Sequence, residues 1–218
     1  MDAALPSGAT SHDFFHRARA RLTLDVPAAL DDPTVEATRG DLDLDPAMWE
    51  QAGVKATRPA AVLVPVVDRS EPTVLLTLRT ELPSHPGQIA FPGGKIEPQD
   101  HTPAEAALRE AAEEIGLARA LIEPIGYLDL YLTFSGYRIL PTVARVDPGY
   151  KLVLSEREVA DAFEVPLTFL MDAQNHALHS RDWKGVTRKY YAMPFGERYI
   201  WGVTAGILRN LYERIYGG

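Results

Sequence analysis

The stretch TPAEAALREAAEEIG, residues 102–116, contains the most informative local signals in the chain. Thr102, Pro103 and Glu105 form a capping box with proline at the first helical position, and Gly116 supplies a stop signal. Between these signals, apolar residues recur at helical spacing and fall on one side of a helical wheel. The stretch therefore predicts an amphipathic helix that begins at Pro103 and ends just before Gly116.

The polar side of this helix carries three carboxylates, Glu110, Glu113 and Glu114. A row of glutamates alone is typical of a solvent-exposed helix face. Two details favour a cation site instead. Glu110 and Glu114 are one turn apart and repel each other, and the tight turn at residues 92–94 offers backbone carbonyls to the same ion. Carboxylate and carbonyl oxygens together suit Mg²⁺ or Mn²⁺.

The segments around this helix alternate between strand and helix patterns. Strands are expected at 60–67, 74–78, 125–132 and 138–146, a mixed segment at 159–171, a hairpin from 187–193 and 198–201, and a closing helix at 203–216. Strands between helices predict a sheet that is covered on both faces, which is an α/β sandwich.

Residues 1–57 differ from the rest of the chain in being polar and rich in alanine and aspartate. A helix is expected at 11–22 and a short one at 46–52. Because Phe14, Phe15 and Leu22 recur at helical spacing, we expect this leader to pack on a body formed by residues 58–218.

Composition narrows the possible partners and location. The 218 residues carry a net charge of −8, so the chain has no general attraction for nucleic acid or an anionic membrane surface. The absence of cysteine excludes disulfides and thiolate metal sites. Neither a membrane-spanning apolar run nor a signal-peptide pattern is found, so a cytoplasmic location is expected.

From Gly94 onward the sequence resembles the Nudix hydrolase family. The family's box is a glycine, five residues, a glutamate, seven residues and then Arg-Glu-apolar-x-Glu-Glu-x-Gly-apolar. The corresponding residues here are GKIEPQD (94–100) and REAAEEIGL (109–117). The helical half matches fully. The loop half is one residue longer and ends in Asp100 in place of glutamate, so the resemblance does not assign Asp100 a role.

The resemblance implies a Nudix-type α/β/α sandwich with a mixed sheet over 58–218, and a metal-dependent pyrophosphohydrolase activity. The implied metal ligands are Glu110, Glu113, Glu114 and the carbonyl of Gly94, with Mg²⁺ or Mn²⁺ as the ion. The implied catalytic residues are Glu113, Arg109, which would orient the carboxylates, and Glu158. For Glu158 the alternatives are a general base, a further metal ligand and a residue of a solvent-exposed loop.

Two stretches before the box, LLTLRT (75–80) and HPGQIAFPGG (85–94), resemble the signature of the coenzyme A pyrophosphatase branch of this family. The resemblance implies cleavage of the coenzyme A diphosphate to 3′-phospho-AMP and 4′-phosphopantetheine. Arg79, His85 and Gln88 are the implied substrate-binding residues, with a surface charge as the alternative for Arg79 and a loop-shaping role as the alternative for His85.

One departure from the branch signature keeps other functions open. Pro83 stands near the place of an arginine, and proline is unable to bind a phosphate as arginine does. The alternatives are a Nudix hydrolase of ADP-ribose or NADH and, less favoured because all three glutamates are present, a non-catalytic nucleotide-binding module. The expected partner is a small-molecule diphosphate, and the chain acts either alone or as a homodimer.

Overall fold

The computed structural model describes residues 10–35, 37, 39–41, 43–44, 46, 53, 55–80, 87–183 and 186–217. The predicted contact residue His85 and nearly all of the helix predicted at 46–52 lie outside these residues. The helices are α1 (Ser11–Arg21), α3 (Pro103–Ile115), α4 (Leu167–Leu170) and α5 (Val203–Ile215). The strands are β1 (Arg39–Gly40), β2 (Arg58–Val67), β3 (Thr73–Arg79), β4 (Ile89–Ala90), β5 (Gly93–Lys95), β6 (Ile122–Tyr127), β7 (Tyr131–Leu132), β8 (Tyr137–Val146), β9 (Val159–Pro166), β10 (Ala177–Trp183), β11 (Val186–Phe195) and β12 (Arg198–Trp201).

Within the described residues, nine strands form one mixed sheet with β2 at its centre. β2 pairs in parallel with β8 along its whole length. Its other edge is shared between two antiparallel partners, because β5 pairs with Ala60–Val62 and β3 pairs with Val66 and Val67. β3 and β5 therefore leave the same edge of β2 at different points, and β3 continues as the partner of β9 and β4.

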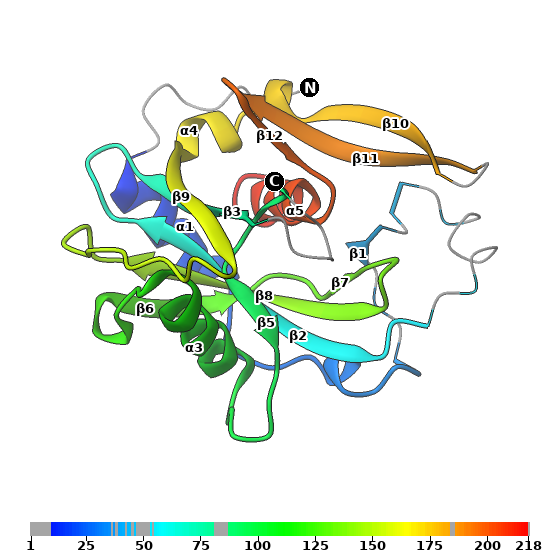
Figure 1. Cartoon of the computed structure of the whole chain (residues 1–218), viewed down its shortest axis with the longest axis horizontal. Helices are drawn as coiled ribbons and strands as arrows, with labels where there is room; N and C mark the ends of the chain where they lie inside the picture. Colours follow the sequence, from blue (N-terminus) through cyan, green and yellow to red (C-terminus); the bar gives the residue numbers. More distant parts are fainter. Residues whose placement is uncertain are drawn as a thin grey trace.

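Alternate side chains of β2 enter two separate hydrophobic cores. Ala61, Leu63 and Val67 are fully buried in the core under α3, whereas Val64 and Val66 are fully buried in the core under α5. Successive side chains of a strand point to opposite faces of its sheet. When helices cover both faces, the side chains on both faces are therefore apolar. The predicted strand and the predicted α/β sandwich with a mixed sheet are confirmed, with α3 and α5 on opposite faces (Figure 1).

A second sheet lies over α5, on the side away from the main sheet (Figure 1). Its strands β10, β11 and β12 are antiparallel, and Met193 and Ile200 are fully buried in the core that includes α5. The predicted hairpin of β11 and β12 is confirmed. β10 was not predicted, because its sequence ALHSRDW has no regular apolar alternation and its outer residues are exposed.

Helix α3 has the predicted bounds, and its ends show why. The Thr102 hydroxyl accepts a hydrogen bond from the Glu105 N–H at 3.1 Å. The Glu105 carboxylate accepts one from the N–H of His101 at 3.0 Å, one residue before the position that a capping box predicts. Gly116 ends the helix in a left-handed conformation with φ of 67°.

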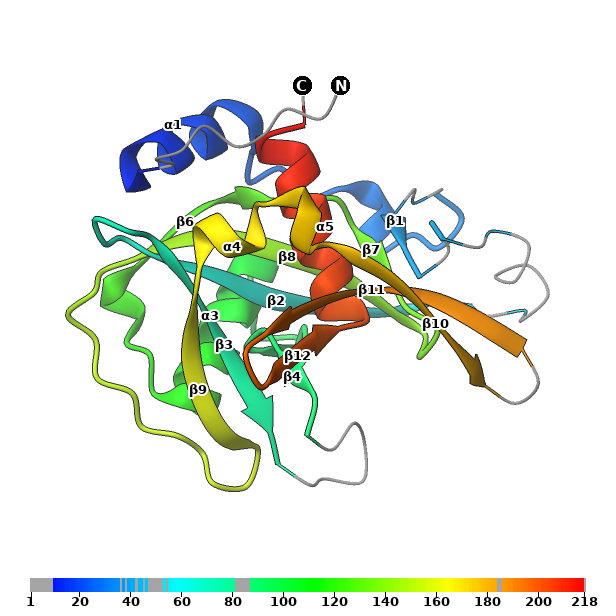
Figure 2. The ribbon, with the colours of Figure 1, turned by 90° about the horizontal axis from the view of Figure 1, so that it is seen from above.

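Helix α1 ends one residue before the predicted helix and lies beside the C-terminal part of α5 (Figure 2). Phe14 and Phe15 are buried in the core that includes α5. The Ser11 hydroxyl donates to Asp68, and Arg21 donates to the carbonyl oxygens of Arg214 and Gly217. None of the described helices is long and apolar enough to cross a bilayer.

Arg138 of β8 attaches a further part of the N-terminal segment to the sheet. Its side chain is only 3% exposed and donates to the carbonyl oxygens of Ala29 at 2.5 Å, Ala56 at 3.1 Å and Val35 at 3.4 Å. Burial lowers the pKa of the Arg138 guanidinium. A buried arginine is tolerated because each of its three nitrogens donates to a backbone carbonyl.

Two predicted segments are divided in the structure. The strand expected at 125–132 is split into β6 and β7, which pair with β8 in registers that differ by one residue, because Tyr127 lies opposite Thr142 and Tyr131 lies opposite Ile139. The mixed segment at 159–171 is resolved into β9 followed by the short helix α4.

Glu164 of β9 is held at the end of the main sheet by three donors. Arg69 donates to both of its carboxylate oxygens, at 2.8 and 3.0 Å, and Thr73 and Tyr150 also donate to it. Burial alone raises the pKa of Glu164, but these donors outweigh burial and lower its pKa to about 2.

This network predicts a pH-dependent contribution to stability. A lowered carboxyl pKa stabilises the fold above the unfolded value of 4.5, and the contribution is lost as pH falls from there towards about 2. We expect Glu164→Gln to lower the free energy of unfolding by about 1–2 kcal/mol at pH 7. Urea unfolding should show this difference shrinking at pH 3. A difference that is constant between pH 7 and pH 3 would contradict the assignment.

Candidate active site

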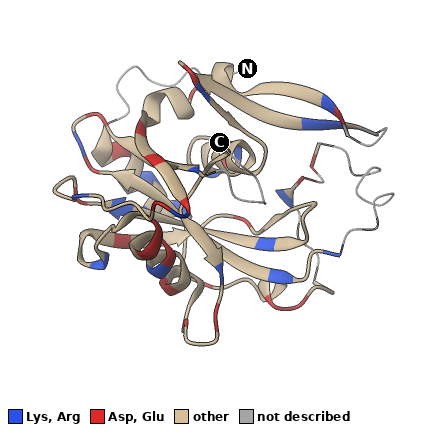
Figure 3. Ribbon diagram, in the orientation of Figure 1, with Lys and Arg blue, Asp and Glu red and all other residues tan. Residues whose placement is uncertain are grey.

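Helix α3 places its acidic residues beside the turn that begins β5. Ala107, Ala111 and Ile115 are fully buried against the main sheet, so the polar side of the helix faces away from that core. Acidic residues are concentrated on α3 (Figure 3). Gly93 and Gly94, at the start of β5, approach the same side of the helix, because the Gly93 N–H donates to the Glu114 carboxylate at 3.3 Å.

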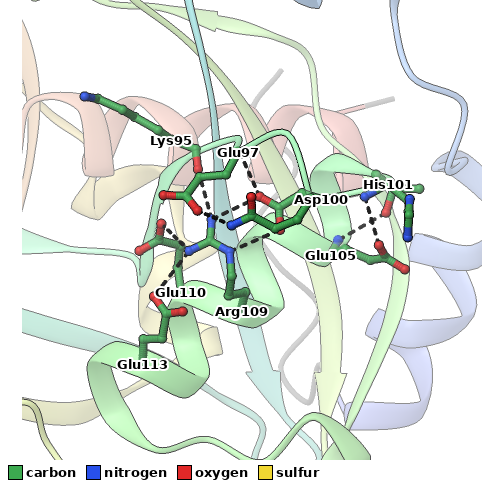
Figure 4. Close-up of polar contacts among 10 residues, drawn as sticks. Lys95, Glu97, Asp100, His101, Glu105, Arg109, Glu110 and Glu113 are labelled. Atoms are coloured by element: carbon green, nitrogen blue, oxygen red, sulfur yellow. Dashed lines mark hydrogen bonds and ion pairs between the residues drawn. The ribbon is translucent and has the colours of Figure 1, made fainter.

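Arg109 is the centre of a polar network on this side (Figure 4). Its guanidinium donates to both carboxylate oxygens of Asp100, at 3.1 and 3.0 Å. It also reaches Glu110 at 3.0 Å, Glu113 at 3.2 Å and the carbonyl of Lys95 at 3.1 Å. Arg109 therefore contacts two of the predicted ligands, Glu110 and Glu113.

Asp100 has a defined structural role that sequence reasoning missed. Its side chain is only 4% exposed and forms the bidentate pair with Arg109. It also accepts a hydrogen bond from the Glu97 N–H at 2.8 Å, and its own N–H donates to the Glu97 carbonyl. The Arg109 hydrogen bonds lower the pKa of Asp100. This local turn brings the shorter aspartate side chain to Arg109 within the longer loop of this sequence.

Glu114 is the most deeply buried carboxylate of the helix. The residue is 4% exposed, and burial, together with the nearby Glu110 and Glu158, raises its pKa to about 7. The opposing interactions are weak, since they comprise the 3.3 Å hydrogen bond from Gly93 and Arg79 at 3.9 Å. A buried carboxylate with so few partners gains stability from a cation.

Gly94 is required by the position of Glu110. A side-chain Cβ at residue 94 would lie 2.5 Å from one carboxylate oxygen of Glu110 and 2.8 Å from the other. Any larger residue would therefore displace this carboxylate from the turn. Burial raises the pKa of Glu110, and the charges of Glu113 and Glu158 act in the same direction.

The other two predicted carboxylates, Glu113 and Glu158, differ in their surroundings. The Glu113 side chain is 60% exposed and contacts Arg109. Glu158, just before β9, is close enough to Glu110 and Glu114 to affect the pKa of both. As the side chains stand, the described residues contain no group of three Asp, Glu or His side chains in position to hold a metal ion.

Two predicted substrate contacts lie next to this acidic group. The Arg79 guanidinium, at the end of β3, lies 3.9 Å from the Glu114 carboxylate. The backbone N–H of Arg79 donates to the backbone carbonyl of Gln88 at 3.0 Å. Gln88 directly precedes β4, which Thr204 attaches to α5 by donating to the Ile89 carbonyl at 2.9 Å. The structure therefore brings Arg79 and Gln88 together with Glu114.

Comparison with known proteins identifies the family. The NUDIX domain family matches residues 57–184, which is more than half of the chain. The chain belongs to the Nudix family. It is a Nudix hydrolase, and members of this family generally use divalent metal ions such as Mg²⁺ or Mn²⁺.

Two curated relatives carry the same name, "Uncharacterized Nudix hydrolase NudL". The protein from Yersinia enterocolitica is 39% identical over 157 residues, and the match covers 72% of this chain and 80% of that protein. The protein from Yersinia pestis is 38% identical over 161 residues, with the same coverage. A solved MutT/nudix family protein from Enterococcus faecalis is similar with a TM-score of 0.45 and 14% identity, covering 88% of this chain and 76% of that one.

The donor set of the Nudix site fits a hard divalent cation. Glu114 is a buried carboxylate with few partners, Glu110 lies against Gly94, and Glu158 adds a third carboxylate nearby. Oxygen ligands of this kind match the coordination preferences of Mg²⁺ and Mn²⁺.

The contact between Gly94 and Glu110 gives a direct test of this geometry. We expect Gly94→Ala to lower kcat by about tenfold or more, because the new methyl group displaces the Glu110 carboxylate. The fold should survive, since the displaced atoms are the end of a flexible side chain. The melting temperature and steady-state hydrolysis would be measured together. Wild-type kcat would show that the position of Glu110 does not matter.

Proposed function

We propose that this Nudix hydrolase cleaves the diphosphate of coenzyme A or its derivatives, giving 3′-phospho-AMP and 4′-phosphopantetheine. The observation that carries the proposal is the placement of Arg79, from the stretch 75–80 that resembles the coenzyme A branch, 3.9 Å from the buried Glu114. This puts a phosphate-binding side chain beside the proposed metal ligands. Gln88, from the second such stretch, is attached to Arg79 through the backbone.

The proposed roles follow from these contacts. Glu110, Glu113, Glu114 and the Gly94 carbonyl hold Mg²⁺ or Mn²⁺, which when bound neutralises diphosphate charge and activates water. Arg109 is a positioning residue, fixed by Asp100, that sets the directions of the Glu110 and Glu113 carboxylates.

Glu158 and Arg79 complete the proposed mechanism. Glu158 accepts a proton from the attacking water, or serves as a further metal ligand, because it lies near both Glu110 and Glu114. Arg79 binds the phosphate that Glu114 and the other carboxylates would otherwise repel. The catalytic body comprises residues 58–218, and residues 1–57 form a leader that supports it.

A second substrate class remains a specific alternative. Pro83 takes the place of an arginine in the branch signature, which favours a less selective site that also accepts ADP-ribose or NADH. Loss of one charge-assisted hydrogen bond lowers affinity by about tenfold to a hundredfold. Selectivity would therefore weaken while the cleaved bond stays the same, because the bond is chosen by the residues around Glu114.

The proposed role of Glu114 predicts that activity and stability separate. Glu114→Gln should lower kcat by about a hundredfold or more, because it removes a ligand charge. Its free energy of unfolding should be unchanged or higher, because a poorly paired buried charge is removed. Glu105→Gln on the same helix is the matched control and should cost about 1 kcal/mol of stability or less and little activity.

Chelation of divalent ions should abolish wild-type turnover, and full activity in excess chelator would refute the mechanism.

The substrate is tested by comparing kcat/KM values in Mg²⁺ for coenzyme A, ADP-ribose, NADH and a nucleoside triphosphate. We expect coenzyme A to give the highest value and its products to be 3′-phospho-AMP and 4′-phosphopantetheine by mass spectrometry. If ADP-ribose or NADH exceeds coenzyme A by tenfold or more, the substrate assignment is wrong.

A further inference from the structure

The second sheet has one face buried and one face that carries aromatic and basic side chains. Met193 and Ile200 pack in the core that includes α5, so residues of the other parity lie on the opposite face. The pairing register places His179 opposite Tyr190 and Arg181 opposite Arg188. We call this surface the aromatic–arginine face, and it consists of His179, Arg181, Arg188, Tyr190, Tyr199 and Trp201.

The aromatic rings of this face form one connected group. The ring centroids of His179 and Tyr199 are 6.1 Å apart, those of His179 and Tyr190 are 6.0 Å apart, and those of Tyr190 and Trp201 are 5.3 Å apart. Tyr199 is 40% exposed, and Trp201 is half-buried rather than part of the core. Partly exposed aromatic rings on one sheet face are suited to stacking against a planar ligand such as a nucleobase.

The two arginines point to a negatively charged ligand. Arg181 and Arg188 are directly opposite each other, an arrangement that destabilises a sheet unless an anion lies nearby. The chain has a net charge of −8, yet within the described residues Arg181 forms no ion pair with a carboxylate. Basic residues lie towards the C-terminal end of β10 and the N-terminal end of β11 (Figure 3).

Arg188 is also only partly satisfied. Its guanidinium lies 4.4 Å from the ring centroid of Phe134, and its buried Nε has no hydrogen-bond partner among the described residues. The charge of Arg188 acts to lower the pKa of the Asp41 carboxylate. That carboxylate already accepts hydrogen bonds from the Tyr131 hydroxyl at 3.1 Å and the Phe134 N–H at 2.8 Å. A buried Nε is out of reach of a surface ligand, so a phosphate would be bound by the terminal nitrogens of Arg188.

The aromatic–arginine face is connected to the proposed diphosphate site by short contacts. β12, which carries Tyr199 and Trp201, packs against β4. Gly202 follows Trp201, and a Cβ at residue 202 would lie 3.7 Å from the Gln88 side-chain nitrogen. The backbone carbonyl of Gln88 in turn accepts a hydrogen bond from the backbone N–H of Arg79, whose side chain pairs with Glu114. A ligand whose diphosphate contacts Arg79 could extend past Gln88 to Trp201.

We propose that the aromatic–arginine face binds the phosphorylated nucleoside end of the diphosphate substrate. The base stacks on Tyr199 and Trp201, and a phosphate that is not cleaved binds Arg181 and Arg188. The proposal rests on the proposed function, because it assigns the nucleotide half of that substrate to a surface beside the cleavage site. It also places phosphate-binding arginines on a different element from the segment that contains Pro83.

The test uses two exposed positions, Arg181→Ala and Tyr199→Ala, in the full chain. Binding of 3′-phospho-AMP and of AMP would be measured by calorimetry in excess chelator, so that turnover plays no part. Each variant should raise the Kd of 3′-phospho-AMP by about tenfold, and Arg181→Ala should also reduce the preference for 3′-phospho-AMP over AMP. With Mg²⁺, the KM for coenzyme A should rise by a similar factor while kcat stays nearly constant.

Matched controls are Leu178→Ala, which is exposed on the other face of β10, and Arg19→Ala on α1. Both should bind and react like the wild type. Unchanged Kd and KM in the two test variants would overturn the proposal. A raised Kd for 3′-phospho-AMP with an unchanged KM would also overturn it, by showing a site for free nucleotide only. If no coenzyme A is hydrolysed but Kd rises as expected, the face stands as a nucleotide site and the proposed function fails.

Discussion

The geometry of the candidate active site depends on the ion pair between Arg109 and Asp100. One guanidinium holds Asp100 with two hydrogen bonds and uses its remaining donors for Glu110, Glu113 and the carbonyl of Lys95. The loop before the helix, the start of the helix's acidic side and the end of β5 are thereby fixed relative to one another. Because Arg109 is always charged, this arrangement persists across the whole pH range in which Asp100 is ionised.

The second constraint is that β2 must satisfy two cores at once. Its odd-numbered residues Ala61, Leu63 and Val67 pack in the core under α3. Its even-numbered residues Val64 and Val66 pack in the core under α5. Helix α3 therefore packs on the same strand whose edge carries β5 and the Gly93–Gly94 turn. The distance between the carboxylates and the turn is set by core packing, which is rigid, rather than by a flexible loop.

The parts of the fold that were predicted from sequence are those with local signals. The helix at Pro103–Ile115 carries its own cap, stop and period, β2 is a nearly continuous apolar run, and β8 is rich in apolar and β-branched residues. The role of Asp100 was missed because it depends on a turn with Glu97 that compensates for a shorter side chain and a longer loop. β10 was missed because an exposed edge strand takes its register from its neighbour and has no apolar period of its own.

The candidate site was predictable to a similar degree. The spacing of the glutamates placed them on one side of a helix, but spacing does not reveal that Glu114 is buried while Glu113 is mostly exposed. That difference arises because β5 and Arg79 contact Glu110 and Glu114, whereas Glu113 lies beyond them and contacts Arg109. The aromatic–arginine face is likewise invisible in sequence, because Arg181 and Arg188 become neighbours only through strand pairing.

The buried Arg138 has a consequence for how the molecule is divided. A fragment starting at residue 58 would match the family boundary closely, yet it would lose the carbonyls of Ala29, Val35 and Ala56 that accept from this guanidinium. It would also uncover Leu140, which Leu30 helps to bury. An unpaired guanidinium and a bare apolar patch would then share one surface, and such a fragment should aggregate. The sequence boundary of the family is thus not a folding boundary of this chain.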